Sequence, residues 1–326
     1  MRPLELIEQA RESALQGKVL NRKSIIALLD IDPDSKEADK LGKVAREVAA
    51  EITQNRAGVW ASIGVDFKKC PMNCHFCSFG DKWGIIKEES EWNASEVVDF
   101  TRKLVSGGAK WITLRTTQFY NIEKLAALAK KIRAAVPGNY KLVANTGELD
   151  NVRAGVLLEA GFQVVYHSLR LREGIDTKFA PEERMATLQI VKNSPLELAF
   201  LVEPVGIEHS NEELADVFLT AMRYGATLTG AMARVPIPGT PLGKFPVISE
   251  RRHAQIVAVT RLAAGYKAPD ICVHPPSQLA MEWGANVTVV EVGAVPRDTR
   301  NYRSEWKNFD MDTAKKWFNR AGYNFC

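Results

Sequence analysis

The chain has 326 residues, of which 46% are hydrophobic and 25% are charged, and its formal net charge is only +4. This composition is ordinary for a globular protein, and the interspersed charges exclude the concentrated basic surface that binds nucleic acid. No stretch approaches the ~20 apolar residues that cross a bilayer, and the first residues lack a signal-peptide core. We therefore expect a cytoplasmic protein with neither a nucleic-acid nor a membrane partner.

The cysteines are few and unevenly spread. Of the five, three fall within eight residues, while Cys272 and Cys326 stand alone. A disulfide framework suits neither the cytoplasm nor a chain of this size, so the pattern favours metal or redox chemistry.

The first 57 residues are expected to form a helical extension. Apolar residues recur at helical spacing from Leu41 to Ile52, and Asp34 with Glu37 is predicted to cap this helix at its start.

From residue 58 onward, strands and helices alternate. The predicted strands are short apolar runs without alternation, which is typical of strands buried on both faces. They cover residues 59–65, 111–114, 141–144, 164–168, 196–202, 227–235, 271–273 and 287–290. Amphipathic helices are predicted at 94–106, 122–135, 151–160, 181–193, 211–224 and 250–264.

This order predicts an α/β fold, a (βα)8 TIM-type barrel over residues 58–300, followed by a C-terminal tail at 301–326 that packs on the barrel. An open doubly wound sheet is the alternative. The glycine fingerprint of dinucleotide-binding sheets is absent after the first strand, which weakens that alternative.

The three clustered cysteines, Cys70, Cys74 and Cys77, follow the first predicted strand. Thiolates at this spacing can ligate three irons of a 4Fe–4S cluster and leave the fourth iron open to a small molecule. Phe76 is expected to shield the cluster from water. A zinc site completed by His75 is the alternative, although His75 is crowded between two cysteines.

The pattern Cys-x3-Cys-x2-Cys, with an aromatic residue before the last cysteine, resembles the signature of the radical S-adenosylmethionine superfamily. The resemblance implies that the open iron binds the amino and carboxylate groups of S-adenosylmethionine. It also implies an electron donor such as flavodoxin or ferredoxin, anaerobic chemistry, and cleavage of the cofactor to a 5'-deoxyadenosyl radical.

Later segments resemble one branch of that superfamily, which contains biotin synthase, the radical maturase of iron–iron hydrogenase and methylornithine synthase. These segments are 142–149 (LVANTGEL), 236–242 (PIPGTPL) and 283–287 (WGANV). Residues 166–173 (YHSLRLRE) resemble the part of the branch that binds the methionine end of the cofactor. The resemblance implies that Arg184 pairs with the cofactor carboxylate, and that Phe76, Ser168, Arg170, Arg172 and Glu173 make neighbouring contacts.

The chain departs from this branch in two places. The segment 114–118 (LRTTQ) replaces a glycine-rich stretch, so the hydroxyls of Thr116 or Thr117 are expected to substitute for some cofactor contacts. The cysteines that hold a second cluster in biotin synthase are missing, and Cys272 lies where that enzyme has an arginine. We therefore expect no second cluster and no sulfur insertion into dethiobiotin.

Polar residues at the ends of the predicted strands are the candidates to bind substrate, because burying them requires a partner. These candidates include both basic and acidic side chains, which indicates a small polar substrate that carries both charges, such as an amino acid. Cys272 either faces this site or is a core residue. The candidates are Arg115, Gln118, Asn145, Glu203, Arg234, Cys272, His274 and Glu291.

Three functions remain open from the sequence. The first is an enzyme (a mutase, lyase or transferase) that uses the radical to rearrange, fragment or modify a small molecule. The second is a metallocofactor-assembly protein like the hydrogenase maturases. The third is a zinc-stabilised binding module.

Overall fold

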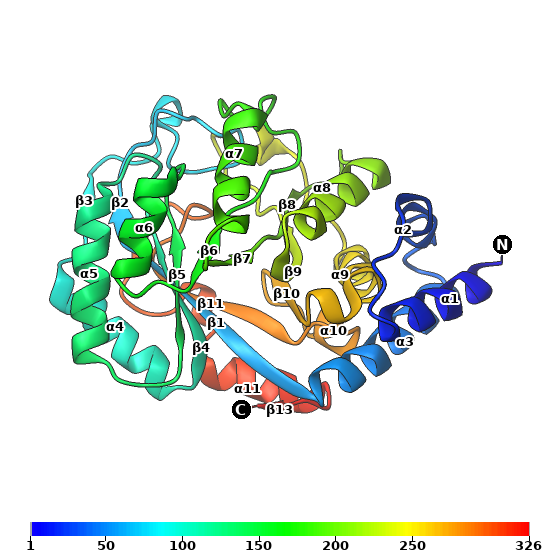
Figure 1. Ribbon diagram of the computed structural model, residues 1–326. Helices are drawn as coiled ribbons and strands as arrows, with labels where there is room; N and C mark the ends of the chain where they lie inside the picture. Colours follow the sequence, from blue (N-terminus) through cyan, green and yellow to red (C-terminus); the bar gives the residue numbers. More distant parts are fainter. Residues whose placement is uncertain (1, 326) are drawn as a thin grey trace.

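The computed structural model describes residues 2–325, and Cys326 lies outside them. Eight parallel strands form a closed barrel, which confirms the predicted TIM-type fold (Figure 1). The barrel closes where the last strand pairs with the first, from Gly58 opposite Val287 to Gly64 opposite Gly293. In barrel order the strands are β1 (Arg56–Gly64), β4 (Ala109–Arg115), β5 (Lys141–Asn145), β6 (Val164–Tyr166), β7 (Glu197–Ala199), β9 (Ala226–Ala233), β10 (Asp270–His274) and β11 (Val287–Ala294).

Helices surround the barrel (Figure 1), and their buried apolar residues belong to the same hydrophobic core as those of the strands. Several begin with a side-chain cap that the sequence supplies; Asn93 and Ser210 each form a capping box with a glutamate three residues later. The outer helices are α4 (Ala94–Ser106), α5 (Ile122–Ala135), α6 (Asn151–Glu159), α7 (Pro181–Lys192), α8 (Asn211–Arg223), α9 (Glu250–Ala264) and α10 (Gln278–Glu282).

The lower part of the barrel is filled by apolar side chains, among them Trp60, Trp111 and Val289. Because this layer is packed, any cavity must lie above it, at the C-terminal ends of the strands, where TIM barrels place their active sites.

One predicted strand divides in two. Instead of a single strand over 196–202, β7 ends at Ala199, and β8 (Val202–Val205) follows it and also pairs with β9. The pairing register shifts along both contacts, so the chain bends between the two strands. The bend carries Glu203, within β8, to the mouth of the barrel.

The N-terminal extension consists of α1 (Pro3–Leu15), α2 (Arg22–Leu29) and α3 (Lys36–Thr53). These helices pack against α9 and cover its outer side, so α9 is buried from His253 to Ala264. The Gln255 amide donates to the carbonyl oxygen of Ile31 at 2.6 Å, which ties α9 to the loop before α3. The predicted cap of α3 is wrong: Ser35, and not Asp34, accepts the hydrogen bond from the Ala38 amide at 3.2 Å.

The tail after the barrel extends from its mouth to its opposite end. β12 (Asn301–Tyr302) pairs antiparallel with β11, Trp306 is buried in a short 3-10 turn, and α11 (Met311–Arg320) leads to β13 (Asn324–Phe325). β13 pairs with the first residues of β1. Trp306 is thereby placed near the mouth and α11 beneath the barrel.

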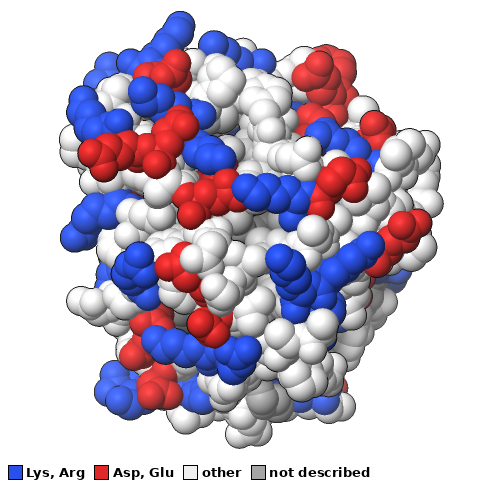
Figure 2. All heavy atoms as spheres, turned by 90° about the vertical axis from the view of Figure 1, so that its left-hand side faces the viewer, with Lys and Arg blue, Asp and Glu red and all other residues white. Residues whose placement is uncertain are grey.

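Charges on the surface are mixed. On the face shown in Figure 2, basic and acidic side chains are interspersed, and neither sign forms a continuous patch. Among residues 2–325, no helix is both long and apolar enough to cross a membrane.

The α3 cap gives a test of this part of the fold. Ser35→Ala should lower the free energy of unfolding by about 1 kcal/mol, because one amide at the start of α3 loses its acceptor. Asp34→Ala should cost at most about 0.5 kcal/mol, because its pair with Arg251 is exposed. Urea denaturation of both variants measures the difference, and a larger loss for Asp34→Ala would refute Ser35 as the cap.

Candidate active site

The three cysteines lie on a braced loop just beyond β1. The Cys70 amide donates to the Phe79 carbonyl at 2.7 Å, and the Cys77 amide donates to the Cys74 carbonyl at 3.0 Å. Asn73 has a positive φ of 49°, which asparagine tolerates better than most residues, and its side chain accepts from the Lys82 amide at 2.8 Å. The loop therefore holds the cysteines in one compact turn.

The thiols are close enough for each to affect its neighbours. Burial, reinforced by the adjacent thiols, raises the pKa of Cys77 to about 12; burial also raises that of Cys74 to about 11. Such thiols stay protonated near neutral pH unless a metal displaces the proton. Among residues 2–325, no three His, Cys, Asp or Glu side chains gather tightly enough for a single metal ion. In a 4Fe–4S cluster each thiolate ligates a different iron, so its cysteines need not converge on one point.

His75 is directed to a different partner. Its Nδ1 lies 3.0 Å from Asp176 Oδ1, and its amide donates to the Asp176 carbonyl at 2.8 Å. These contacts fasten the cysteine loop to the segment after β6. They leave Nε2 as the ring nitrogen of His75 that a metal could use.

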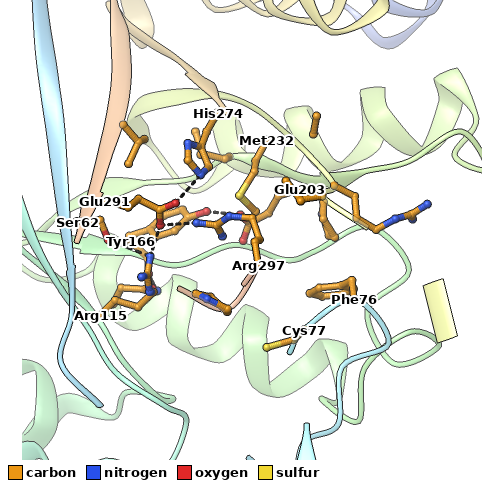
Figure 3. Close-up of a pocket in the computed structure, with 18 of the residues that line it drawn as sticks. Ser62, Phe76, Cys77, Arg115, Tyr166, Glu203, Met232, His274, Glu291 and Arg297 are labelled. Atoms are coloured by element: carbon orange, nitrogen blue, oxygen red, sulfur yellow. Dashed lines mark hydrogen bonds and ion pairs between the residues drawn. The ribbon is translucent and has the colours of Figure 1, made fainter. Parts of the chain in front are cut away.

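A cavity of about 150 Å³ opens beside Cys74 and Cys77 at the mouth of the barrel. Figure 3 shows Phe76 and Cys77 at one side of it, Glu291, Arg115 and His274 at the other, and Arg297 between them. Of the residues that the sequence predicts, the structure brings Phe76, Arg115, Asn145, Arg170, Glu203, Arg234, His274 and Glu291 into its lining.

Glu291 is the centre of the charged end of the cavity. It is fully buried and accepts from Arg115 at 2.5 Å, lies 3.1 Å from His274 Nε2, and accepts from Arg297. Burial alone would raise the pKa of Glu291, but the charge of Arg297, with His274 and Arg115, holds it well below the usual range. Glu291 is therefore ionised at neutral pH.

A second buried group lies between Glu291 and the cysteines. The Tyr166 hydroxyl donates to Glu203, and burial raises the pKa of Glu203, although the charge of Arg170 opposes this. Arg170 lies 3.7 Å from both Glu203 and Glu173, and its Nη1 has no hydrogen-bond partner among residues 2–325. Arg170 thus faces the cavity with a free donor beside the cysteines.

Arg184 lies behind Arg170 and not in the cavity. Its Nη1 donates to Glu148 at 2.7 Å, its Nη2 donates to the Ser168 carbonyl at 2.8 Å, and its Nε lies 3.4 Å from Glu173. Glu173 in turn accepts from the Arg170 amide at 3.0 Å. Arg184 and Glu173 therefore position Arg170, and the Ser168 hydroxyl accepts from the Leu201 amide instead of facing the cavity.

Comparison with known proteins connects this geometry to a family. No protein-family model matches the chain. The biotin synthase of Frankia alni is 25% identical over 270 residues, which span 80% of this chain and 76% of that protein. The biotin synthase of Mycolicibacterium paratuberculosis is 23% identical and spans 89% of this chain and 83% of that protein.

Solved structures agree on the fold. Methylornithine synthase PylB superposes with a TM-score of 0.81 at 15% identity, covering 97% of each chain. The FeFe-hydrogenase maturase HydG from Carboxydothermus hydrogenoformans superposes with a TM-score of 0.79 at 17% identity, covering 99% of this chain and 80% of HydG. The chain is related to the radical S-adenosylmethionine enzymes. That relationship implies a 4Fe–4S cluster, S-adenosylmethionine, a small-molecule substrate and an electron donor, and it leaves the reaction subclass open.

Besides Arg184, Ser168 and Glu173, three further predicted site residues lie away from the cavity. Arg172 is on the outside, where it contacts Glu213 at 3.1 Å. Gln118 lines an outer groove that also contains Cys70. Cys272 faces into the barrel but lies in the apolar layer beneath the cavity, so it is a core residue. The Thr117 hydroxyl donates a hydrogen bond to Asp66, and the Thr116 hydroxyl donates one to the Thr146 hydroxyl at 3.0 Å.

Two residues of the site were missed by the sequence analysis. Tyr166 ends β6 as Asn145 ends β5, and this shared position is the signal that could have identified it. Arg297 lies in the loop after β11, where no periodic pattern marks it. Only the rule that loops after barrel strands build the active site points to it.

The Glu291 cluster predicts a large stability effect. Glu291→Gln should lower the free energy of unfolding by about 3–5 kcal/mol, because Arg115 and Arg297 then face each other without an anion. Glu8→Gln, which breaks the exposed pair with Lys40, should cost less than about 1 kcal/mol. Chemical denaturation measures both.

The same cluster predicts a pH dependence. Because the folded-state pKa of Glu291 is lowered, its contribution is present above the unfolded pKa of about 4.3 and is lost as the pH falls below it. The stability of the natural protein should therefore decline more steeply below that pH than that of Glu291→Gln. Parallel declines would contradict an ionised, paired Glu291.

Proposed function

We propose that Cys70, Cys74 and Cys77 ligate one 4Fe–4S cluster whose open iron binds S-adenosylmethionine. When bound and reduced, the cluster supplies one electron that breaks a C–S bond of the cofactor, giving methionine and a 5'-deoxyadenosyl radical that takes a hydrogen atom from the substrate. The observation that carries this proposal is the convergence of Cys74, Cys77 and Arg170 on one cavity whose opposite end is polar.

Arg170 is our candidate to bind the carboxylate of the cofactor. Its Nη1 has no hydrogen-bond partner among the described residues, and its charge partly opposes the rise that burial causes in the pKa of Cys74. A guanidinium with a free edge suits a carboxylate. Arg184, whose two terminal nitrogens already donate to Glu148 and Ser168, supports Arg170 through Glu173.

The opposite end of the cavity supports a small, polar substrate resembling an amino acid. Arg115, Arg297 and His274 surround Glu291 there, and Glu203 lies between them and the cysteines. Both signs of charge are thus available within one enclosed space. The reaction we propose is rearrangement, fragmentation or group transfer, with electrons from a donor such as flavodoxin or ferredoxin.

A maturase-like role in metallocofactor assembly is the second candidate, favoured by the similarity of the fold to HydG. Sulfur insertion like that of biotin synthase is disfavoured, because Cys272 is enclosed by apolar side chains. A single thiol there cannot hold a second cluster.

Iron content tests the cluster. Protein reconstituted without oxygen should bind about four irons per chain, and Cys70→Ala, Cys74→Ala or Cys77→Ala should abolish this binding, because the cluster needs all three thiolates. Cys272→Ala is the matched control and should keep the iron. With dithionite and S-adenosylmethionine, the loaded protein should release 5'-deoxyadenosine. Stoichiometric zinc in place of iron, or release that does not depend on the three cysteines, would contradict the proposal.

Cofactor affinity tests the assignment of Arg170. Arg170→Gln should weaken binding of S-adenosylmethionine by about tenfold or more while keeping the iron, because one charge-assisted hydrogen bond is lost. Arg172→Gln, on the outside of the barrel, is the control and should bind normally. Isothermal titration of iron-loaded protein measures both, and unchanged affinity in Arg170→Gln would refute the assignment.

A further inference from the structure

We propose that Arg297 binds a carboxylate group of the substrate. This inference rests on the proposed function and names the chemistry that the far end of the cavity recognises. No sequence pattern marks Arg297, which lies in the loop after β11 and reaches the centre of the cavity (Figure 3).

Four arginines line the cavity; two of them already have several acceptors, and a third, Arg170, is our candidate for the cofactor. Arg115 donates to Ser62 at 3.1 Å, to Glu291 at 2.5 Å and to the Ala294 carbonyl. Arg234 forms a two-point contact with Glu208. Arg170 lies beside the cysteines, between Glu173 and Glu203.

Arg297 has fewer acceptors than Arg115 and Arg234. Among residues 2–325, its only hydrogen-bond acceptor is Glu291, which one of its terminal nitrogens contacts. A buried guanidinium with unused donors is costly unless a ligand supplies acceptors. The side chain keeps 13% of its surface accessible, so part of the guanidinium can be reached from the cavity.

The hydrogen-bond acceptors at this end give the same answer. Arg115 and Arg297 share the single carboxylate of Glu291. Glu203 also acts on Arg297 through its charge, but it accepts no hydrogen bond from Arg297 among residues 2–325. A ligand carboxylate, which matches the planar edge of a guanidinium, suits the donors of Arg297 that Glu291 does not use.

The surroundings hold Arg297 in place for this role. Its guanidinium lies 5.6 Å from the ring centre of Trp306, and Trp306 is anchored by its Nε1 hydrogen bond to Asp298 at 3.0 Å. Arg297 is thus fixed between an aromatic ring and Glu291. In Figure 3 it lies between Glu291 on one side and Phe76 and Cys77 on the other, so a small molecule whose carboxylate binds Arg297 would occupy the space between these two ends.

Binding of simple carboxylates tests the inference directly. Iron-loaded protein is first saturated with S-adenosylmethionine, so that the carboxylate site of the cofactor is filled. It is then titrated with sodium butyrate, or with butylammonium chloride at equal ionic strength, and tryptophan fluorescence and melting temperature are recorded. We expect saturable binding of butyrate only.

Variants assign the binding to one residue. Arg297→Gln should weaken butyrate binding by about tenfold or more, and Arg297→Lys should restore part of it, since the charge is kept. Arg303→Gln, an exposed arginine of the same segment that pairs with Glu96, should behave like the natural protein. Absence of saturable butyrate binding, equal affinity in Arg297→Gln, or preference for butylammonium would overturn the inference.

The proposed function is judged separately. Iron content and slow release of 5'-deoxyadenosine without substrate depend on the cysteines and should be the same in Arg303→Gln as in the natural protein. Their absence from the natural protein would refute the proposed function, whereas normal release without saturable butyrate binding would refute only the role of Arg297.

Discussion

Parallel pairing between β1 and β11 closes the barrel, and both ends of the cavity depend on it. β1 leads directly into the cysteine loop, and β11 carries Glu291 and leads to Arg297. In this pairing Ser62 lies opposite Glu291, which places the acceptors of Arg115 side by side. The loops beyond the two strands are also joined, because the Ser78 amide donates to the Pro296 carbonyl at 3.0 Å.

Two glycines allow this close approach. A Cβ at Gly64 would lie 1.9 Å from the Ala294 carbonyl oxygen, and Gly293 has a φ of 81°, which disfavours other residues. The pairing of β1 with β11 therefore fixes the position of the cysteine loop relative to the charged end of the cavity. A radical formed at one end must reach a substrate held at the other, so this spacing is part of the chemistry.

Buried charges above the apolar layer hold one another in place around the site. Ionised side chains are costly to bury, and those of the site are paired in groups: Glu291 with Arg115 and Arg297, and Glu173 with Arg170 and Arg184. Arg170 and Arg297 both line the cavity, from different ends, and among residues 2–325 each keeps a donor without a partner. We interpret them as the positions where the cofactor and the substrate complete the pairing.

The sequence predicted the barrel well because its signals are local. Each buried parallel strand is a short apolar run, and the cysteine spacing is read within eight residues. The roles of Arg184 and Arg297 could not be predicted, because they depend on contacts between residues far apart in the sequence or in irregular loops. Arg170 and Arg184 follow the same strand, and only the structure shows that Glu148 and Ser168 occupy the donors of Arg184. Arg297 lies in an irregular loop, and only its contacts with Glu291 and Trp306 show that it belongs to the site.

The central claim is that three cysteines leave one iron of a cluster open to S-adenosylmethionine. Mössbauer spectroscopy of protein reconstituted with iron-57 tests it most directly. On addition of S-adenosylmethionine, about one iron in four should change its isomer shift while the rest keep theirs, because only the iron without a thiolate gains new ligands. A spectrum in which all irons remain equivalent and unchanged would contradict the account.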